Sequence, residues 1–191
     1  MSGLDDFAVL GELLKDEVLV KPSMNVHGNM VLELAEPQNA GRPVILSSLP
    51  RRLVVVKADM FSSPGTVFKN TRGECKRADY VIIAEKDNNR GKFIILLEMK
   101  SGTGDSEREI QQQLSGAQCF IEYCRAIGRT FWKADNFLEG FQYRFVSIRK
   151  MGCPKQPTRV AEKSVPHDRP ERMLKLSSPN HLEFNHLAGK R

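Results

Sequence analysis

The sequence predicts a mixed α/β (α+β) domain, and three observations lead to this fold class. Apolar residues recur first at helical spacing, then in several strand-like runs, then along one long helix, and finally in strands again. The chain has 191 residues, which suits one domain with one core. With 40% hydrophobic and 27% charged residues, its composition is typical of globular proteins. We therefore expect a single domain over residues 1–191, with a core at about 4–150 and a basic C-terminal extension at 151–191.

The first half of the chain is expected to contain one helix followed by strands. Apolar residues with helical spacing predict a helix from Leu4 to about Asp16. Short apolar runs separated by turn-forming residues then predict strands. These runs are Met30–Ala35, Val44–Ser47, Leu53–Ala58, Arg77–Glu85 and Lys92–Lys100. The last two of them flank a polar segment and are expected to form a hairpin.

A long helix is predicted next, from about Ser106 to Ala126, with an apolar stripe along one side. Asp105 or Ser106 could cap its N-terminus, and Gly128 is expected to end it. Two more strands are predicted after it, at Phe141–Lys150 and Glu171–Ser177, with a proline-rich loop between them.

The charge of the chain is compatible with a polyanionic partner. Lys and Arg total 29 against 23 acidic residues, which gives a formal net charge of +6. The excess is concentrated after residue 150. Nucleic acid is one partner that such a basic segment would attract, and a segment that only improves solubility is an equally open interpretation.

Several classes of protein are excluded by what the sequence lacks. No apolar run approaches the roughly 20 residues that span a bilayer, so no membrane partner is expected. The acidic N-terminus does not resemble a secretory signal, so we expect a cytoplasmic, nucleoid or nuclear protein. The four cysteines form no C-x-x-C pair, which argues against structural zinc and against a disulfide framework.

Three residues combine into a pattern that carries chemistry. Glu98 and Lys100 lie at the end of an apolar strand, and their spacing puts both side chains on one face of it. Asp79, on the preceding strand, could bring a second carboxylate to the same place. Two converging carboxylates suit a hard cation such as Mg²⁺, and a nearby ammonium can stabilise negative charge on a phosphate.

This Asp79…Glu98-Met99-Lys100 pattern resembles the D…(D/E)-x-K motif of the PD-(D/E)XK nucleases. The flanking strands and the long helix after Lys100 also resemble that family's restriction-endonuclease-like αβββαβ core, a central mixed sheet flanked by helices. Ala78 stands where the family has proline. The resemblance implies a phosphodiester hydrolase, an endonuclease or exonuclease, that acts on DNA more often than RNA. It also implies a cofactor, Mg²⁺ or Mn²⁺, bound by Asp79 and Glu98, with Lys100 assisting catalysis.

The resemblance suggests further residues and partners. In some branches of the family an additional acid joins the metal site, and Glu12, Glu17 or Glu33 is the candidate for it here. Lys76 and Arg77 precede Asp79 and are expected to contact phosphates. Gln113 lies beside the apolar stripe of the long helix and is a further candidate contact to nucleic acid. A homodimer, or a separate recognition or motor subunit, would be a plausible partner.

Two other functions remain open from the sequence. The first is a non-catalytic protein on the same fold that binds nucleic acid or serves as an assembly subunit. The second is a structural subunit whose apolar strands pair with a partner. An E-x-K tripeptide alone is common at solvated strand ends, so the nuclease interpretation depends on Asp79 and on the surrounding elements.

Overall fold

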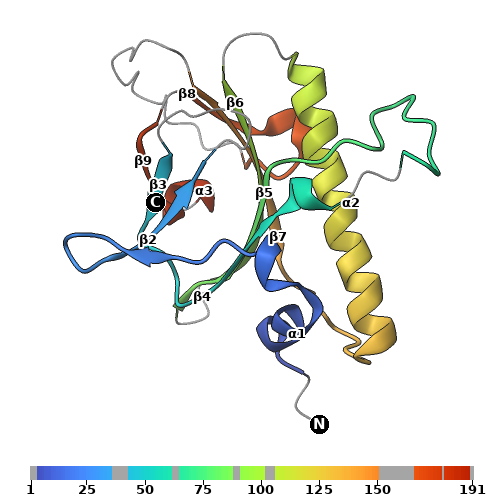
Figure 1. Ribbon diagram of the computed structural model, residues 1–191, viewed down its shortest axis with the longest axis horizontal. Coiled ribbons are helices and arrows are strands. Elements are labelled where there is room, and N and C mark those ends of the chain that lie inside the picture. Colours follow the sequence, from blue (N-terminus) through green and yellow to red (C-terminus); the bar gives the residue numbers. More distant parts are fainter. Residues whose placement is uncertain are drawn as a thin grey trace.

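The computed structural model describes residues 4–35, 43–61, 65–87, 91–101, 106–150, 166–177 and 179–189. These residues form two mixed sheets and few helices, so the mixed α/β class is confirmed. Three layers are visible in Figure 1: the long helix, a central sheet, and a smaller second sheet on the far side. Among the described residues, no helix is both long and apolar enough to cross a membrane.

The central sheet has five strands in the order β4-β5-β6-β7-β8. Its first three strands are antiparallel neighbours, and β7 and β8 then continue the sheet in parallel. The strands are β4 (Arg52–Lys57), β5 (Tyr80–Glu85), β6 (Lys92–Ser101), β7 (Gln142–Lys150) and β8 (Leu174–Ser177). The hairpin of β5 and β6 was predicted, although β5 begins at Tyr80 and leaves Asp79 just outside the strand.

The strand β6 is the centre of the core because it is buried on both faces. Ile94 and Leu96 pack with the long helix, whereas Phe93, Ile95 and Leu97 pack with the second sheet. All five are at most 1% exposed, which explains why this strand is a continuous apolar run and not an alternating one.

The helix α2 (Glu107–Phe131) covers one face of the central sheet. It begins with a capping box. The side chain of Ser106 accepts a hydrogen bond from the backbone N–H of Glu109, and the carboxylate of Glu109 accepts one from the backbone N–H of Ser106. The prediction that Gly128 ends the helix was wrong. A Cβ atom at Gly128 would lie 2.2 Å from the ring of Phe137, so this glycine allows close packing inside the helix.

The helix α1 (Asp6–Leu13) is shorter than predicted and lies against one end of the central sheet. Asp5 caps it and forms an ion pair with Arg52, and Lys92 Nζ lies 3.4 Å from Asp6. A 3-10 turn (η1) at Asp16–Val18 follows the helix.

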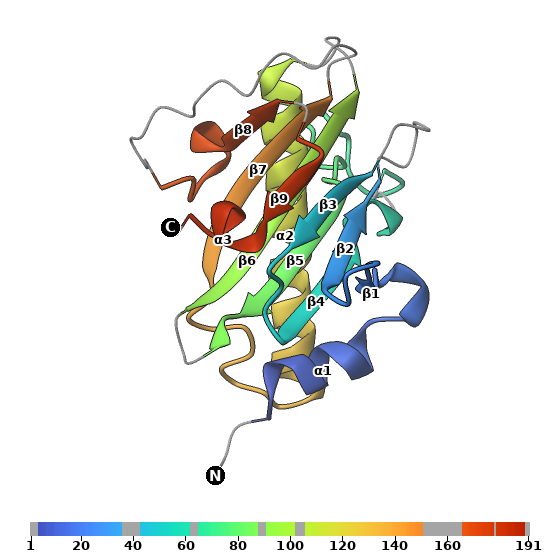
Figure 2. The same cartoon turned by 90° about the vertical axis from the view of Figure 1, so that its left-hand side faces the viewer.

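A second sheet, which the sequence did not predict as separate, covers the face of the central sheet opposite α2 (Figure 2). Its order is β1-β2-β3-β9, from the strands β1 (Ser23–Met24), β2 (Met30–Leu34), β3 (Val44–Ser47) and β9 (His181–Glu183). The short helix α3 (Phe184–Leu187) follows β9, and its two buried residues, Phe184 and Leu187, pack in the core that the two sheets share. The segment after residue 165 therefore contributes a strand to each sheet, in addition to its basic residues.

Candidate active site

Strand pairing brings Asp79 and Glu98 together. Tyr80 and Leu97 form the last pair between β5 and β6, so Asp79 and Glu98 stand opposite each other one position further along. Glu98 and Lys100 lie two and four positions after Leu96, and therefore share its face, toward α2. The backbone carbonyl of Asp79 accepts a 2.8 Å hydrogen bond from Ala58, which ties this end of β5 to the residue after β4.

The two carboxylates and the lysine form one connected group. Glu98 Oε2 accepts from the backbone N–H of Asp79 at 3.1 Å, and Asp79 Oδ2 accepts from the N–H of Met99 at 2.7 Å. Lys100 Nζ lies 2.8 Å from Glu98 Oε1 as an ion pair. The structure thus brings together all three residues that the sequence pattern singled out.

Burial gives Glu98 an unusual electrostatic state. The residue is 0% exposed, and desolvation together with the neighbouring charge of Asp79 raises its pKa to about 8, against the opposing effect of Lys100. Oε1 of Glu98 makes no hydrogen bond of acceptable geometry, although Lys100 is close. A buried carboxylate whose pKa is raised by desolvation and by a second carboxylate favours the binding of a further cation.

The residues fit a divalent metal of the Mg²⁺ type. Mg²⁺ is commonly held by one or two protein carboxylates, with waters and substrate phosphates completing its octahedral shell. Asp79 and Glu98 meet this requirement. Among the described residues there is no group of three or more His, Cys, Asp or Glu side chains that could hold an ion.

The structure does not bring a third acid from the predicted candidates to this pair. Glu12 Oε2 accepts a 2.7 Å hydrogen bond from the indole N–H of Trp132, at the C-terminal end of α2. Glu17 is exposed in η1 beside Lys15, and Glu33 is exposed on β2 of the second sheet. Each side chain therefore has a place in the fold away from Asp79 and Glu98.

The basic residues before Asp79 are partly occupied by contacts within the protein. Arg77 donates to the backbone carbonyls of Glu74 and Lys76 and stacks on the ring of Phe61. Lys76 Nζ lies 3.4 Å from Glu109 on α2, with a third of its side chain exposed. Lys76 thus keeps part of its side chain in contact with solvent.

Gln113 lies on the side of α2 that faces the segment before Asp79. Glu109 and Gly116, one turn to either side of it, both meet Lys76. Gly116 permits the closest approach, since a Cβ atom there would lie 1.8 Å from the carbonyl oxygen of Lys76. The side-chain oxygen of Gln113 is buried and has no hydrogen-bond partner among the described residues.

Sequence reasoning missed a polar row that continues from this site across β7 and β8. Glu98 pairs with Ser147, and Ser147 with Lys175, while Lys100 pairs with Arg149. The alternation of the predicted strand at 141–150 could have placed Ser147 and Arg149 on one face. Only the parallel pairing with β6 shows that this face is the one that carries Glu98 and Lys100.

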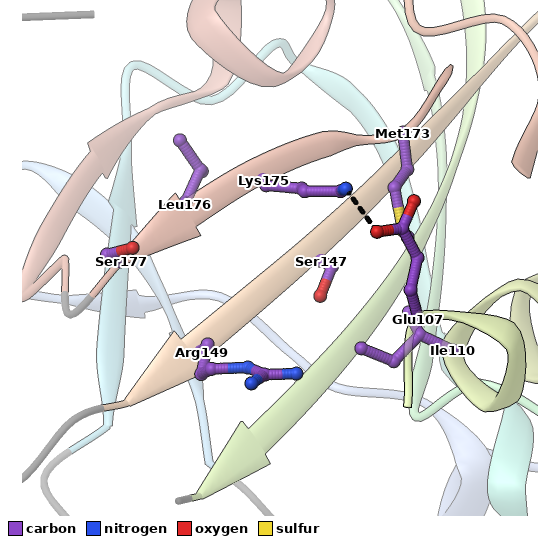
Figure 3. Close-up of a pocket in the computed structure, with 8 residues that line it drawn as sticks. All are labelled: Glu107, Ile110, Ser147, Arg149, Met173, Lys175, Leu176 and Ser177. Atoms are coloured by element: carbon purple, nitrogen blue, oxygen red, sulfur yellow. Dashed lines mark hydrogen bonds and ion pairs between the residues drawn. The ribbon is translucent and has the colours of Figure 1, made fainter. Parts of the chain in front are cut away.

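A pocket of about 270 Å³ lies over this row, between β7, β8 and the first turn of α2 (Figure 3). Its polar lining residues are Glu107, Ser147, Arg149, Lys175 and Ser177, and its apolar ones are Ile110, Met173 and Leu176.

Comparisons with protein-family models, with curated proteins and with solved structures found no match for this chain. The site must therefore be interpreted from its own geometry.

Proposed function

We propose that this protein is a metal-dependent nuclease that hydrolyses phosphodiester bonds in nucleic acid, with DNA as the favoured substrate. The observation that carries the proposal is the convergence of Asp79, Glu98 and Lys100 on one face at the centre of the sheet. Burial of a carboxylate is costly unless the charge is compensated, and a bound cation would provide that compensation.

The arrangement of the elements supports the same proposal. In chain order, α1, β4, β5, β6, α2 and β7 form a helix, an antiparallel three-stranded unit, a helix and a strand parallel to β6. This order is that of the αβββαβ core of the PD-(D/E)XK nucleases, which the sequence motif also resembles. In this interpretation β1, β2 and β3 are an insertion after α1, and β8 extends the sheet.

Each residue of the group has a distinct chemical role in this proposal. Asp79 and Glu98 would hold Mg²⁺ or Mn²⁺, with Oε1 of Glu98, now in an ion pair with Lys100, as one ligand atom. When bound, such an ion polarises a phosphate oxygen and lowers the pKa of a coordinated water. Lys100 would orient the attacking water or stabilise the negative charge that builds up on the phosphate. Gln113 and Lys76, on the side of α2 and its neighbouring loop, would help to position the nucleic acid.

The test is a cleavage assay on single-stranded DNA, duplex DNA and RNA, with Mg²⁺, with Mn²⁺ and with EDTA. The wild type is expected to cut at least one substrate only when metal is present, and Glu98→Gln and Lys100→Ala to lose roughly a hundredfold or more of that activity. Glu33→Gln is the matched control, since it removes an exposed carboxylate on the other sheet. Cleavage that survives Glu98→Gln, or that needs no metal, would rule the proposal out.

A second function is favoured by one specific observation. Asp79 and Glu98 each accept a backbone N–H, so the pair also joins the ends of β5 and β6 as an ordinary structural contact would. A non-catalytic protein that binds nucleic acid or serves as an assembly subunit could retain the pair for this reason alone. Calorimetry with Mg²⁺ and Mn²⁺ separates the two functions, because only the nuclease requires that the wild type bind metal and that Glu98→Gln lose it.

A further inference from the structure

The pocket beside the carboxylate pair is built from residues to which the proposed chemistry gives no role. Ser147 borders Glu98 directly, and Lys175 lies one strand further along the same row. Adjacent strands are about 4.8 Å apart, so the row runs about 10 Å from Glu98 to Lys175. The pocket therefore lies beside the carboxylate pair, on the same face of the central sheet.

The polar atoms in the pocket are suited to an anion. Lys175 from β8 and the half-buried Arg149 from β7 supply two positive charges on one face. Ser147 is only 5% exposed, and its hydroxyl makes no hydrogen bond to another described residue. Figure 3 shows this hydroxyl directed into the space between Arg149 and Lys175. A serine hydroxyl that lines a pocket can donate a hydrogen bond to a phosphate oxygen that enters it.

One carboxylate in the pocket competes with such an anion. Lys175 Nζ lies 2.7 Å from Glu107 Oε2, and the side chains are 58% and 53% exposed. An exposed ion pair of this kind contributes little to stability and exchanges readily with other partners. Glu107 therefore occupies, within the protein, the position on Lys175 that a phosphate would take.

The pocket is small and has an apolar wall beside its basic residues. A volume of about 270 Å³ is slightly below the range of roughly 300–1,000 Å³ for sites of drug-sized ligands. Ile110, Met173 and Leu176 line the pocket with apolar surface, which suits a sugar or the face of a base. A phosphate-sugar unit matches this combination of basic, hydroxyl-bearing and apolar side chains.

We infer that this pocket binds a backbone phosphate of the nucleic acid that flanks the bond to be cut, through Lys175, Arg149 and Ser147. The inference rests on the proposed function for the identity of the ligand. It adds the direction in which the nucleic-acid strand leaves the carboxylate pair. Glu107 leaves Lys175 when the strand enters. Removing the charge of Glu107 should therefore raise the affinity for nucleic acid, whereas removing the charge of Lys175 should lower it.

The test is equilibrium binding of fluorescent single-stranded and duplex DNA and of RNA, by anisotropy in EDTA at several KCl concentrations. Lys175→Gln and Arg149→Gln are each expected to weaken binding about tenfold and to lower the salt slope by about 0.7–0.9. Glu107→Gln is expected to tighten binding. Lys21→Gln is the matched control, since Lys21 is an exposed lysine paired with Asp16 near the opposite edge of the central sheet, and it should match the wild type.

The possible results separate this inference from the proposed function. Binding that responds in opposite directions to Lys175→Gln and Glu107→Gln supports it even if the wild type cuts nothing. A wild type that cuts with Mg²⁺, but whose binding is insensitive to both changes, overturns it and leaves the nuclease intact. If Lys175→Gln and Glu107→Gln change the affinity in the same direction, the ion pair between them is only structural. This result also overturns the inference. So does a wild type that binds a labelled nucleoside monophosphate but no oligonucleotide.

Discussion

At the scale of single residues, Glu98 is the most strongly perturbed group of the site. It is fully buried, and desolvation together with the neighbouring charge of Asp79 raises its pKa to about 8. A raised pKa means that the folded protein holds a proton that the unfolded chain releases at about pH 4.5. The protonated side chain therefore contributes stability that is fully present below pH 4.5 and is lost as the pH rises through 8.

This state predicts a pH-dependent effect of Glu98→Gln in EDTA. The amide is neutral at every pH, so the melting temperature of the variant should exceed that of the wild type progressively more between pH 5 and pH 9. Thermal melts followed by circular dichroism in matched buffers would measure the difference. Glu33→Gln should show no such trend, because that side chain is exposed. An equal gap at pH 5 and pH 9 would contradict the raised pKa.

At the scale of elements, the glycines of α1 and α2 differ in the space around them. Glycine in a helix ordinarily costs about 0.5–1 kcal/mol relative to alanine. At Gly11 in α1 a Cβ atom would have nothing within 4 Å, whereas at Gly128 it would lie 2.2 Å from the ring of Phe137. The same substitution should therefore have opposite signs at the two positions.

We expect Gly11→Ala to stabilise the protein by about 0.5–1 kcal/mol. Gly128→Ala should destabilise it by roughly 1–3 kcal/mol, because the added methyl overpacks the contact with Phe137 by more than the gain in helix propensity. Urea denaturation monitored by the fluorescence of Trp132, with circular dichroism as the second probe, would measure both values. Stabilisation by Gly128→Ala would mean that Phe137 can move aside, and that this close contact is not needed.

At the scale of the whole molecule, the C-terminal residues join the two sheets. β9 pairs in parallel with β3, and Phe184 packs edge-on against Phe93 of β6 with ring centroids 6.5 Å apart. His167 is buried beside α3, where a ring nitrogen lies 2.7 Å from the carbonyl oxygen of Leu187, and desolvation lowers its pKa. The last residues are therefore part of the core that the second sheet shares with the central one.

Phe184→Ala should lower the free energy of unfolding by about 3–5 kcal/mol, because the ring is 1% exposed and its loss leaves a cavity between the sheets. Phe131→Ala is the matched control: that ring is 74% exposed, so its loss should cost at most about 0.5 kcal/mol. Chemical denaturation of both variants would give the two values. Similar small losses for both would show that α3 is not part of the cooperative core.

The sequence predicted the elements that local patterns determine. The β5–β6 hairpin and α2 follow from apolar periodicity and from the capping residue Ser106, which depend on neighbours within a few positions. The convergence of Asp79, Glu98 and Lys100 was also predictable, because one hairpin and the alternation of side chains along a strand are enough to produce it.

Only the tertiary structure decided the features that depend on distant pairing. The parallel addition of β7 and β8 to β6 puts Ser147, Arg149 and Lys175 beside Glu98, and no local pattern specifies which strand is the neighbour. The same holds for β9, which closes the second sheet from the far end of the chain. Burial, and with it the raised pKa of Glu98, also results from tertiary packing, because it depends on how completely α2 and both sheets exclude water.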